Sequence, residues 1–298
     1  MEAIRRIHHI SAIVGDPNEN LKFYRDVLGL RLIKQTVNFD DPGVYHLYFS
    51  DHDATPGTVI TFFPWTNDRR EGRKGSGQVG RIAFRVPKGS LGEWQDHISS
   101  QNIDVEVTEL FGKDTLEFED THGLELALVE GEASAEDNAI QGFHGAVLLS
   151  ADPSGTKAML TDMMGLTELD YDGQNLHFET VGEEKHHIIT AIPPLAPGRF
   201  GIGTVHHIAW SVPDMGVLND WQAALKDENF GVTEIKDRHY FNSIYVSEKG
   251  HVVFEFATAG PGFDRDEDKD ALGTALKLPP QYEHRRGEYE SLLPKLDV

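Results

Sequence analysis

The fold is decided by the stretch Val205-His206-His207-Ile208-Ala209-Trp210-Ser211-Val212. This run is apolar and β-branched, opens on a histidine pair and is followed by a Pro-Asp turn, so it predicts a buried strand that ends in a loop. A near copy, Ile7-His8-His9-Ile10-Ser11-Ala12-Ile13-Val14, lies close to the N-terminus. A third version, Arg81-Ile82-Ala83-Phe84-Arg85-Val86, has an arginine where the second histidine stands in the others. The chain is therefore built from repeats, of which only some keep a histidine pair.

The composition indicates a soluble globular protein with a small-molecule partner. Its 298 residues are 39% hydrophobic, which is sufficient for one large domain or two ordinary ones. The net charge of -22 repels nucleic acid and anionic membranes. We find no signal peptide and no apolar run of spanning length, so we expect a cytoplasmic protein. The sequence leaves open whether the chain forms a homo-oligomer and whether its acidity reflects adaptation to salt.

The absence of cysteine restricts the chemistry that the chain can carry. Without cysteine there are no disulfides, no thiolate ligands and no thiol nucleophile. Any metal ion must therefore be held by histidine and carboxylate side chains.

Four segments share the order of a strand, a helix and several further strands, and we call each of them a module. They are module 1 (residues 4–64), module 2 (80–130), module 3 (141–192) and module 4 (204–257). In module 1 we expect a helix over Asn20 to Leu30, ended by Gly29. Matching helix residues relate module 1 to module 3, and Trp94-Gln95 and Trp221-Gln222 relate module 2 to module 4. This pattern suggests a two-module unit that was duplicated.

The segments between and after the modules are expected to be solvated. The linker at 65–79 is rich in glycine and basic residues, namely Arg69, Arg70, Arg73 and Lys74. An acidic linker spans 131–140, and a proline-rich segment at 193–198 precedes module 4. The tail carries the charged run Asp264 to Asp270, which is typical of a solvated loop or cap.

Side-chain alternation selects the candidate metal ligands. In a strand, His207 shares one face with Ala209 and Ser211, whereas His206 shares the other face, which packs under a helix. The small, partly polar face can line a cavity, so His207 and its counterpart His9 are the better ligand candidates. Glu255 lies within the apolar strand that follows His251, and a buried carboxylate needs either a cation or its own proton.

Taken together, these repeats resemble the vicinal oxygen chelate superfamily, and more narrowly the hydroquinone-type ring-cleaving dioxygenases. The stretches that carry the narrower resemblance are spread in order from end to end. They are Tyr45-His46-Leu47-Tyr48-Phe49, Thr55-Pro56-Gly57-Thr58-Val59, Gly72-Arg73-Lys74-Gly75-Ser76, Pro87-Lys88-Gly89-Ser90-Leu91, Val212-Pro213-Asp214-Met215 and the tail Leu272-Gly273, Leu276-Lys277 and Pro280-Gln281.

The resemblance implies an α+β fold of four βαβββ modules in two domains. It also implies one mononuclear Fe(II), or in some members Mn(II), bound by His9, His207 and Glu255. Two imidazoles and one carboxylate leave three coordination positions open, the arrangement of non-haem iron oxygenases. Glyoxalase I, a relative in fold, uses four protein ligands. The position that matches Glu255 in module 1 is Thr61, so the fourth ligand is missing.

Around the metal ligands, the resemblance implies roles for His8, Ser11, His206, Arg238 and Tyr245. The family has a threonine where this chain has Ser11, which keeps the hydroxyl. His8 or His206, together with Tyr245, would donate or accept protons, and Arg238 would stabilise oxyanion character or hold a distal hydroxyl. We interpret His144, His186 and His187 as structural and assign no role to His46, His52 and His97.

Since a cavity in this fold takes ligands from two modules, the distant ends of the chain are predicted to pair. Residues 1–64 and 204–258 would form the metal-binding domain, 80–130 and 141–192 the other domain, and 259–298 a C-terminal tail. The function implied is an Fe(II)-dependent, extradiol-type dioxygenase that cleaves hydroquinones or related dihydroxylated aromatic compounds with O₂. Two alternatives stay open: a glyoxalase-like metal-dependent lyase, isomerase or thiol transferase, and a non-catalytic binding or resistance protein.

Overall fold

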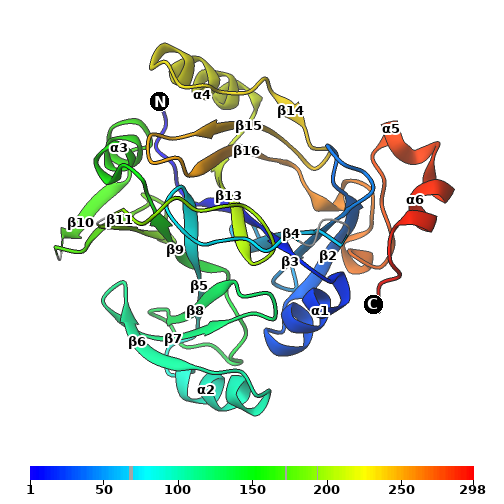
Figure 1. Cartoon of the computed structure of the whole chain (residues 1–298), viewed down its shortest axis with the longest axis horizontal. Helices are drawn as coiled ribbons and strands as arrows, with labels where there is room; N and C mark the ends of the chain where they lie inside the picture. Colours follow the sequence, from blue (N-terminus) through cyan, green and yellow to red (C-terminus); the bar gives the residue numbers. More distant parts are fainter. Residues whose placement is uncertain (67–69, 172, 193) are drawn as a thin grey trace.

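Two eight-stranded sheets form the body of the protein in a computed structural model (Figure 1). The structure describes residues 1–66, 70–171, 173–192 and 194–298, so Arg69 of the basic linker and Pro193 of the proline-rich segment lie outside the described residues. The first sheet has the order β14-β15-β16-β13-β1-β4-β3-β2, and the second has the order β10-β11-β12-β9-β5-β8-β7-β6. No described helix is long and apolar enough to cross a membrane.

The first sheet takes its strands from the two ends of the chain. Its N-terminal half contains β1 (Ile7–Val14), α1 (Pro17–Lys22), a π-helical turn (Phe23–Val27), β2 (Arg31–Val37), β3 (Tyr45–Ser50) and β4 (Val59–Pro64). Its C-terminal half contains β13 (Thr204–Val212), α4 (Met215–Asp227), β14 (Lys236–Asp237), β15 (Phe241–Ser247) and β16 (Val253–Pro261). The halves join where β1 pairs antiparallel with β13.

The second sheet takes its strands from the middle of the chain. One half contains β5 (Gln78–Val86), α2 (Leu91–Ser100), β6 (Glu106–Leu110), β7 (Lys113–Glu119) and β8 (Glu125–Glu130). The other half contains β9 (Phe143–Leu149), α3 (Pro153–Ala158), a π-helical turn (Met159–Met163), β10 (Thr167–Tyr171), β11 (Asn175–Glu179) and β12 (His187–Ala191). Here β5 pairs antiparallel with β9. The predicted α+β class with four βαβββ modules is confirmed, and on these two sheets we propose the domain division given above.

Helices cover the outer faces of the sheets because their apolar residues recur at helical spacing. In α4, the side chains of Leu218, Trp221 and Leu225 are all fully buried, and the indole of Trp221 stacks on Phe256 with ring centroids 4.4 Å apart. Burial of each such side chain stabilises the fold by about 1.5–3 kcal/mol. Asp214 caps this helix by accepting a hydrogen bond from the backbone N–H of Val217 at 3.0 Å.

The first helix begins earlier than predicted. The sequence was expected to form a helix over Asn20 to Leu30, but α1 starts at Pro17, because Asp16 accepts hydrogen bonds from the backbone N–H groups of Asn18 and Glu19. Its last part is a π-helical turn. Gly29 follows with a φ of 69°, the left-handed conformation that ends helices, as expected.

A β-bulge interrupts the alternation of side chains at each histidine pair. The register passes from Ile7 opposite Trp210 to His9 opposite Ala209, so His8 is the extra residue of β1. It passes from Ser11 opposite His207 to Ala12 opposite Val205, so His206 is the extra residue of β13. The expectation that strict alternation would place His206 under a helix is therefore wrong. At each bulge the ring of the extra histidine lies beside that of the histidine that follows it, His8 beside His9 and His206 beside His207.

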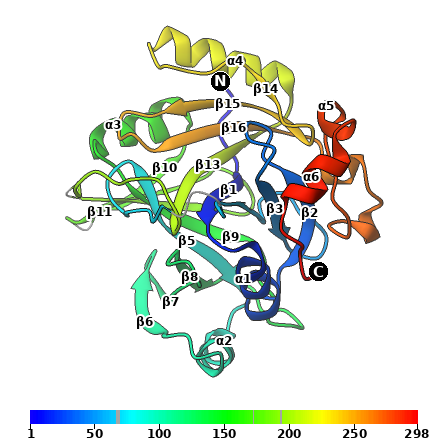
Figure 2. The ribbon, with the colours of Figure 1, turned by 45° about the vertical axis from the view of Figure 1, so that its right-hand side comes forward.

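The C-terminal tail packs against the first sheet, where α5 (Pro280–Glu283) and α6 (Arg286–Leu292) lie beside β2 (Figures 1 and 2). The ammonium group of Lys34 on β2 is fully buried and pairs with Asp266 at 2.8 Å and with Glu267, whose side chain is 3% exposed. The prediction that the whole charged run is solvated is therefore wrong for these two acids. They neutralise a lysine that burial would otherwise make costly.

Candidate metal centre

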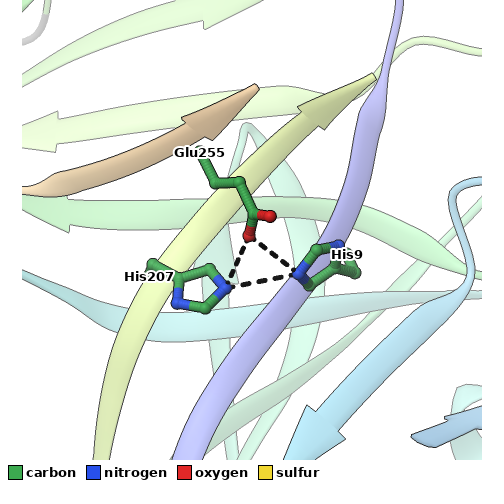
Figure 3. Close-up of side chains that lie close together, drawn as sticks. All are labelled: His9, His207 and Glu255. Atoms are coloured by element: carbon green, nitrogen blue, oxygen red, sulfur yellow. Dashed lines mark hydrogen bonds and ion pairs between the residues drawn. The ribbon is translucent and has the colours of Figure 1, made fainter. Parts of the chain in front are cut away.

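Three side chains from three adjacent strands converge in the first sheet. His9 comes from β1, His207 from β13 and Glu255 from β16 (Figure 3). Nε2 of His9 lies 3.2 Å from Nε2 of His207. Oε2 of Glu255 lies 2.8 Å from Nε2 of His207 and 3.1 Å from Nε2 of His9. The sequence prediction selected the three residues that the fold brings together.

The spacing of these atoms suits a metal ion. Ligand atoms about 2.1 Å from an ion and at right angles to one another lie about 3 Å apart. The three side chains are 4% exposed or less, and in the described part of the chain no group hydrogen-bonds Oε1 of Glu255. Burial alone would raise the pKa of this carboxyl, but His9 and His207 outweigh burial and hold the pKa well below its usual range. Glu255 therefore presents an anionic oxygen at the centre of the cluster.

The hydrogen bonds of His8 assign the tautomer of His9. Burial lowers the pKa of His8 to about 3, so its ring is neutral near pH 7. Its Nε2 lies 3.2 Å from the carbonyl oxygen of Thr258, which only accepts, so Nε2 carries the hydrogen. Nδ1 of His8 must then accept from Nδ1 of His9 at 2.8 Å. His9 is left with a lone pair on Nε2, the form that binds a metal ion.

His206 contacts His207 through the same pair of ring nitrogens by which His8 contacts His9. Its Nδ1 lies 2.8 Å from Nδ1 of His207, and burial lowers the pKa of His206 to about 3. A metal ion on Nε2 of His207 requires the same donation, from Nδ1 of His207 to Nδ1 of His206. The difference is at the far side of the ring: in the described residues no hydrogen bond occupies Nε2 of His206, and this ring lines a cavity.

That cavity has a volume of about 230 Å³ and includes His9 and His207 in its wall. Its polar lining includes Arg238 and Tyr245, and Nε of Arg238 donates to the Tyr245 hydroxyl at 3.1 Å. Asp40, from the loop between β2 and β3, accepts from Arg238 at 2.9 Å. Burial raises the pKa of Tyr245, which therefore keeps its proton. The structure thus brings Arg238 and Tyr245 into the same cavity wall as the candidate ligands His9 and His207.

A hydrogen-bonded chain that the sequence analysis missed links His46 and Tyr48 in the cavity wall to Thr61 and Ser11. The Tyr48 hydroxyl lies 2.9 Å from Nδ1 of His46, and Nε2 of His46 lies 2.8 Å from the Thr61 hydroxyl. The Thr61 hydroxyl in turn lies 2.6 Å from that of Ser11. His46 and Tyr48 line the cavity, so His46, to which the sequence analysis assigned no role, lies beside the candidate ligands. In the described part of the chain, the Ser11 hydroxyl is linked to the site through Thr61.

The second sheet has the same antiparallel strand pairing with two bulges, but other residues occupy the positions of the candidate metal ligands. Its bulges fall at Gly80 and His144, so Arg81 stands where His9 does and Gly145 where His207 does. A side chain at Gly145 would meet the carbonyl oxygen of His187 at 1.9 Å. Arg81 lines a cavity of about 540 Å³ with several carboxylates, and its guanidinium pairs with Glu117 and Glu125. This larger cavity has the space but lacks the donor set.

The paired βαβββ modules and the His/His/Glu cluster at their junction define a protein of the vicinal oxygen chelate class. The chain belongs to the Glyoxalase/Bleomycin resistance protein/Dioxygenase superfamily, whose family model matches residues 6–136 and 142–256.

Similar proteins narrow this assignment. The chain is 46% identical to MhqO of Bacillus subtilis (strain 168), a provisionally assigned ring-cleaving dioxygenase. The alignment covers 97% of this chain and 96% of the other protein. It is 32% identical to the chlorohydroquinone/hydroquinone 1,2-dioxygenase of Sphingobium indicum, over 96% of this chain and 95% of that protein. A crystal structure of a provisionally assigned dioxygenase from Bacillus subtilis is similar with a TM-score of 0.96 and 44% identity, over 100% of this chain and 99% of the other. Glyoxalase I from Zea mays shares the fold, with a TM-score of 0.64 and 13% identity over 85% and 92% of the two chains.

Proposed function

We propose that this protein is an Fe(II)-dependent ring-cleaving dioxygenase of the extradiol type that uses O₂ to open hydroquinones or related dihydroxylated aromatic rings. The observation that carries the proposal is the buried cluster of His9, His207 and Glu255. Its two histidines lie in the wall of a cavity that Arg238 and Tyr245 also line. The names of the relatives support it. In this proposal the three residues are the metal ligands, with Fe(II) or Mn(II) as the ion.

The donor set fits a metal that must share its coordination sphere with other molecules. Two imidazoles and a carboxylate leave open positions on one side of an octahedral ion. When bound, Fe(II) would supply the redox chemistry by which ground-state O₂ reacts with a closed-shell aromatic ring. Thr61 stands where a fourth protein ligand would stand, which keeps that side open.

The residues of the chain would hold the ring and move its protons. A hydroquinone has its second hydroxyl across the ring, where the protein must bind it. Arg238 remains charged and donates to the oxygen of Tyr245, so the Tyr245 proton is left for a second acceptor such as a substrate oxygen. Arg238 would also stabilise negative charge that develops on that oxygen.

The two extra histidines of the bulges would have different roles. The Nε2 hydrogen of His8 is bound to the Thr258 carbonyl, so His8 orients His9 and has no proton to offer. The His206 ring lines the cavity, and in the described residues its Nε2 has no hydrogen-bond partner. His206 is therefore the better placed of the two to donate a proton to, or accept one from, the substrate.

The experiment that tests this function is anaerobic loading with Fe(II), followed by measurement of oxygen uptake with a series of hydroquinones and catechols. We expect uptake and ring-opened product with hydroquinones. Activity that needs Zn(II) or Ni(II) and consumes no oxygen would favour a glyoxalase-like lyase, isomerase or thiol transferase instead. Tight binding of aromatic compounds without turnover or metal would favour a binding or resistance protein.

A further inference from the structure

A second cavity lies behind the candidate metal centre. It has a volume of about 250 Å³ and is formed between the loop that joins β3 to β4 and the C-terminal tail. His8 lies in its wall, whereas His9 lies in the wall of the substrate cavity. The two cavities therefore approach the same pair of histidine rings from different sides.

Residues that line one cavity contact residues that line the other. Phe241 lines the substrate cavity, and its ring centroid lies 5.1 Å from that of His8 and 5.2 Å from that of His9. Val59, in the wall of the second cavity, is the β4 partner of His9 in the sheet. One apolar cluster contains residues of both cavities, among them Tyr48 and Phe241 of the first and Val59, Tyr240 and Leu272 of the second.

Apart from the ring of His8, the inner end of the second cavity is apolar, and its charged residues lie at the outer end. Its inner wall is made by Val59, Tyr240 and Leu272, each 3% exposed or less. At the outer end, exposed Lys269 and Asp53 form an ion pair of 3.2 Å. The one polar ring at the inner end, that of His8, already bonds to Thr258 and His9. Stable water needs two to four polar partners, so the inner part suits a small apolar guest.

On this geometry, and on the proposed dioxygenase function, we propose that the second cavity is the entry route for dioxygen. His9 and His207 line the 230 Å³ cavity, so a ring bound there would lie against the ligand cluster and obstruct passage from that side. O₂ is a small apolar molecule that the apolar cluster around Phe241 can admit, whereas a hydroquinone cannot pass it. The two substrates would thus reach one centre through separate openings.

Ala54 and Ala259 allow the route to be narrowed without touching the metal centre. Both line the second cavity, and neither is among the buried residues of the core. In Ala54→Phe and Ala259→Phe, we expect kcat/KM for O₂ to fall about tenfold, with kcat/KM for hydroquinone and kcat at saturating O₂ unchanged. Ala223→Phe, at an exposed position of α4, is the matched control and should behave as wild type. Loss of hydroquinone capture instead, or unchanged O₂ capture in both variants, would overturn the proposal.

Xenon provides a readout that does not depend on turnover, because it occupies dry apolar cavities. In crystals of the wild type under xenon pressure we expect a xenon atom between Val59 and Leu272, and none in Ala54→Phe. Absence of xenon from the wild-type cavity would show that it is not a route for an apolar gas. If xenon binds but no hydroquinone is consumed, the proposed dioxygenase function fails, and with it the role of the cavity as a route for dioxygen. The finding that the cavity admits an apolar gas would remain.

Discussion

Thr61 occupies in β4 the position that Glu255 occupies in β16. Thr61 is the partner of Ser11, two residues after His9, and Glu255 is the partner of Ala209, two residues after His207. The first sheet therefore has two equivalent positions for a carboxylate and uses one. With Thr61 at the second position, the candidate site has three protein ligands, whereas a carboxylate there would provide a fourth.

Thr61→Glu is predicted to keep the bound metal and lose most of the ring-cleaving activity, because a fourth protein ligand would take one of the open coordination positions. Metal content by elemental analysis and oxygen uptake measure the two effects. Thr61→Val is the control that removes the hydroxyl without adding a ligand, and it should retain more activity. Full oxygen uptake in Thr61→Glu would mean that position 61 does not face the metal.

Glu255→Gln is predicted to lose most of the bound iron while leaving the fold intact. The amide has nearly the same shape but removes the single anionic ligand of a buried site. Iron content measures the occupancy of the site, and circular dichroism measures whether the fold is kept. Glu125→Gln, on the second sheet, is the matched control. A metal content equal to that of wild type would show that Glu255 is not a ligand.

Tyr245→Phe and Arg238→Ala are predicted to lower turnover of hydroquinones about 100-fold while iron binding changes little. Both side chains line the cavity but are not ligand candidates, so their loss affects the ring rather than the ion. Single-turnover assays on iron-loaded protein measure this. If both variants keep full activity, or if the wild type cleaves catechol and ignores hydroquinones, the hydroquinone assignment fails.

The metal-free protein is predicted to lose stability as the pH falls below about 6.5. Burial lowers the pKa of His144 to about 2, so between these values the unfolded chain binds a proton that the native protein does not. At pH 5 this one group would cost about 2 kcal/mol relative to neutral pH.

Urea unfolding at pH 7.5 and pH 5 tests this, with His144→Phe expected to lose less stability between the two pH values than wild type. His52→Gln is the control, since its ring is 85% exposed. An identical pH dependence in His144→Phe and wild type would contradict the assigned cause.

The sequence was sufficient to predict the fold and the convergence of the three candidate ligands. Repeats and strand alternation carry that information, and a buried Glu255 needed either a cation or its own proton. The bulges were not predictable, because a register shift depends on the partner strand, and so the predicted position of His206 under a helix was wrong. His46 left a usable signal: it shares a face of β3 with Tyr48, and Tyr48 pairs with Thr61 of β4. The ion pairs of Lys34 depend on a tail that returns from the far end of the chain and has no local pattern.

The pairing of β1 with β13 also sets the order in which a nascent chain can acquire its structure. His9 and His207 are 198 positions apart, and all strands of the second sheet lie between them. Because synthesis runs from the N-terminus, the central sheet can close while β1 still has no partner. Until β13 and β16 leave the ribosome, β1 exposes an apolar edge and a histidine without its companions. In the growing polypeptide, β1 must wait for β13 and β16, so the three candidate ligands come together only late in biosynthesis.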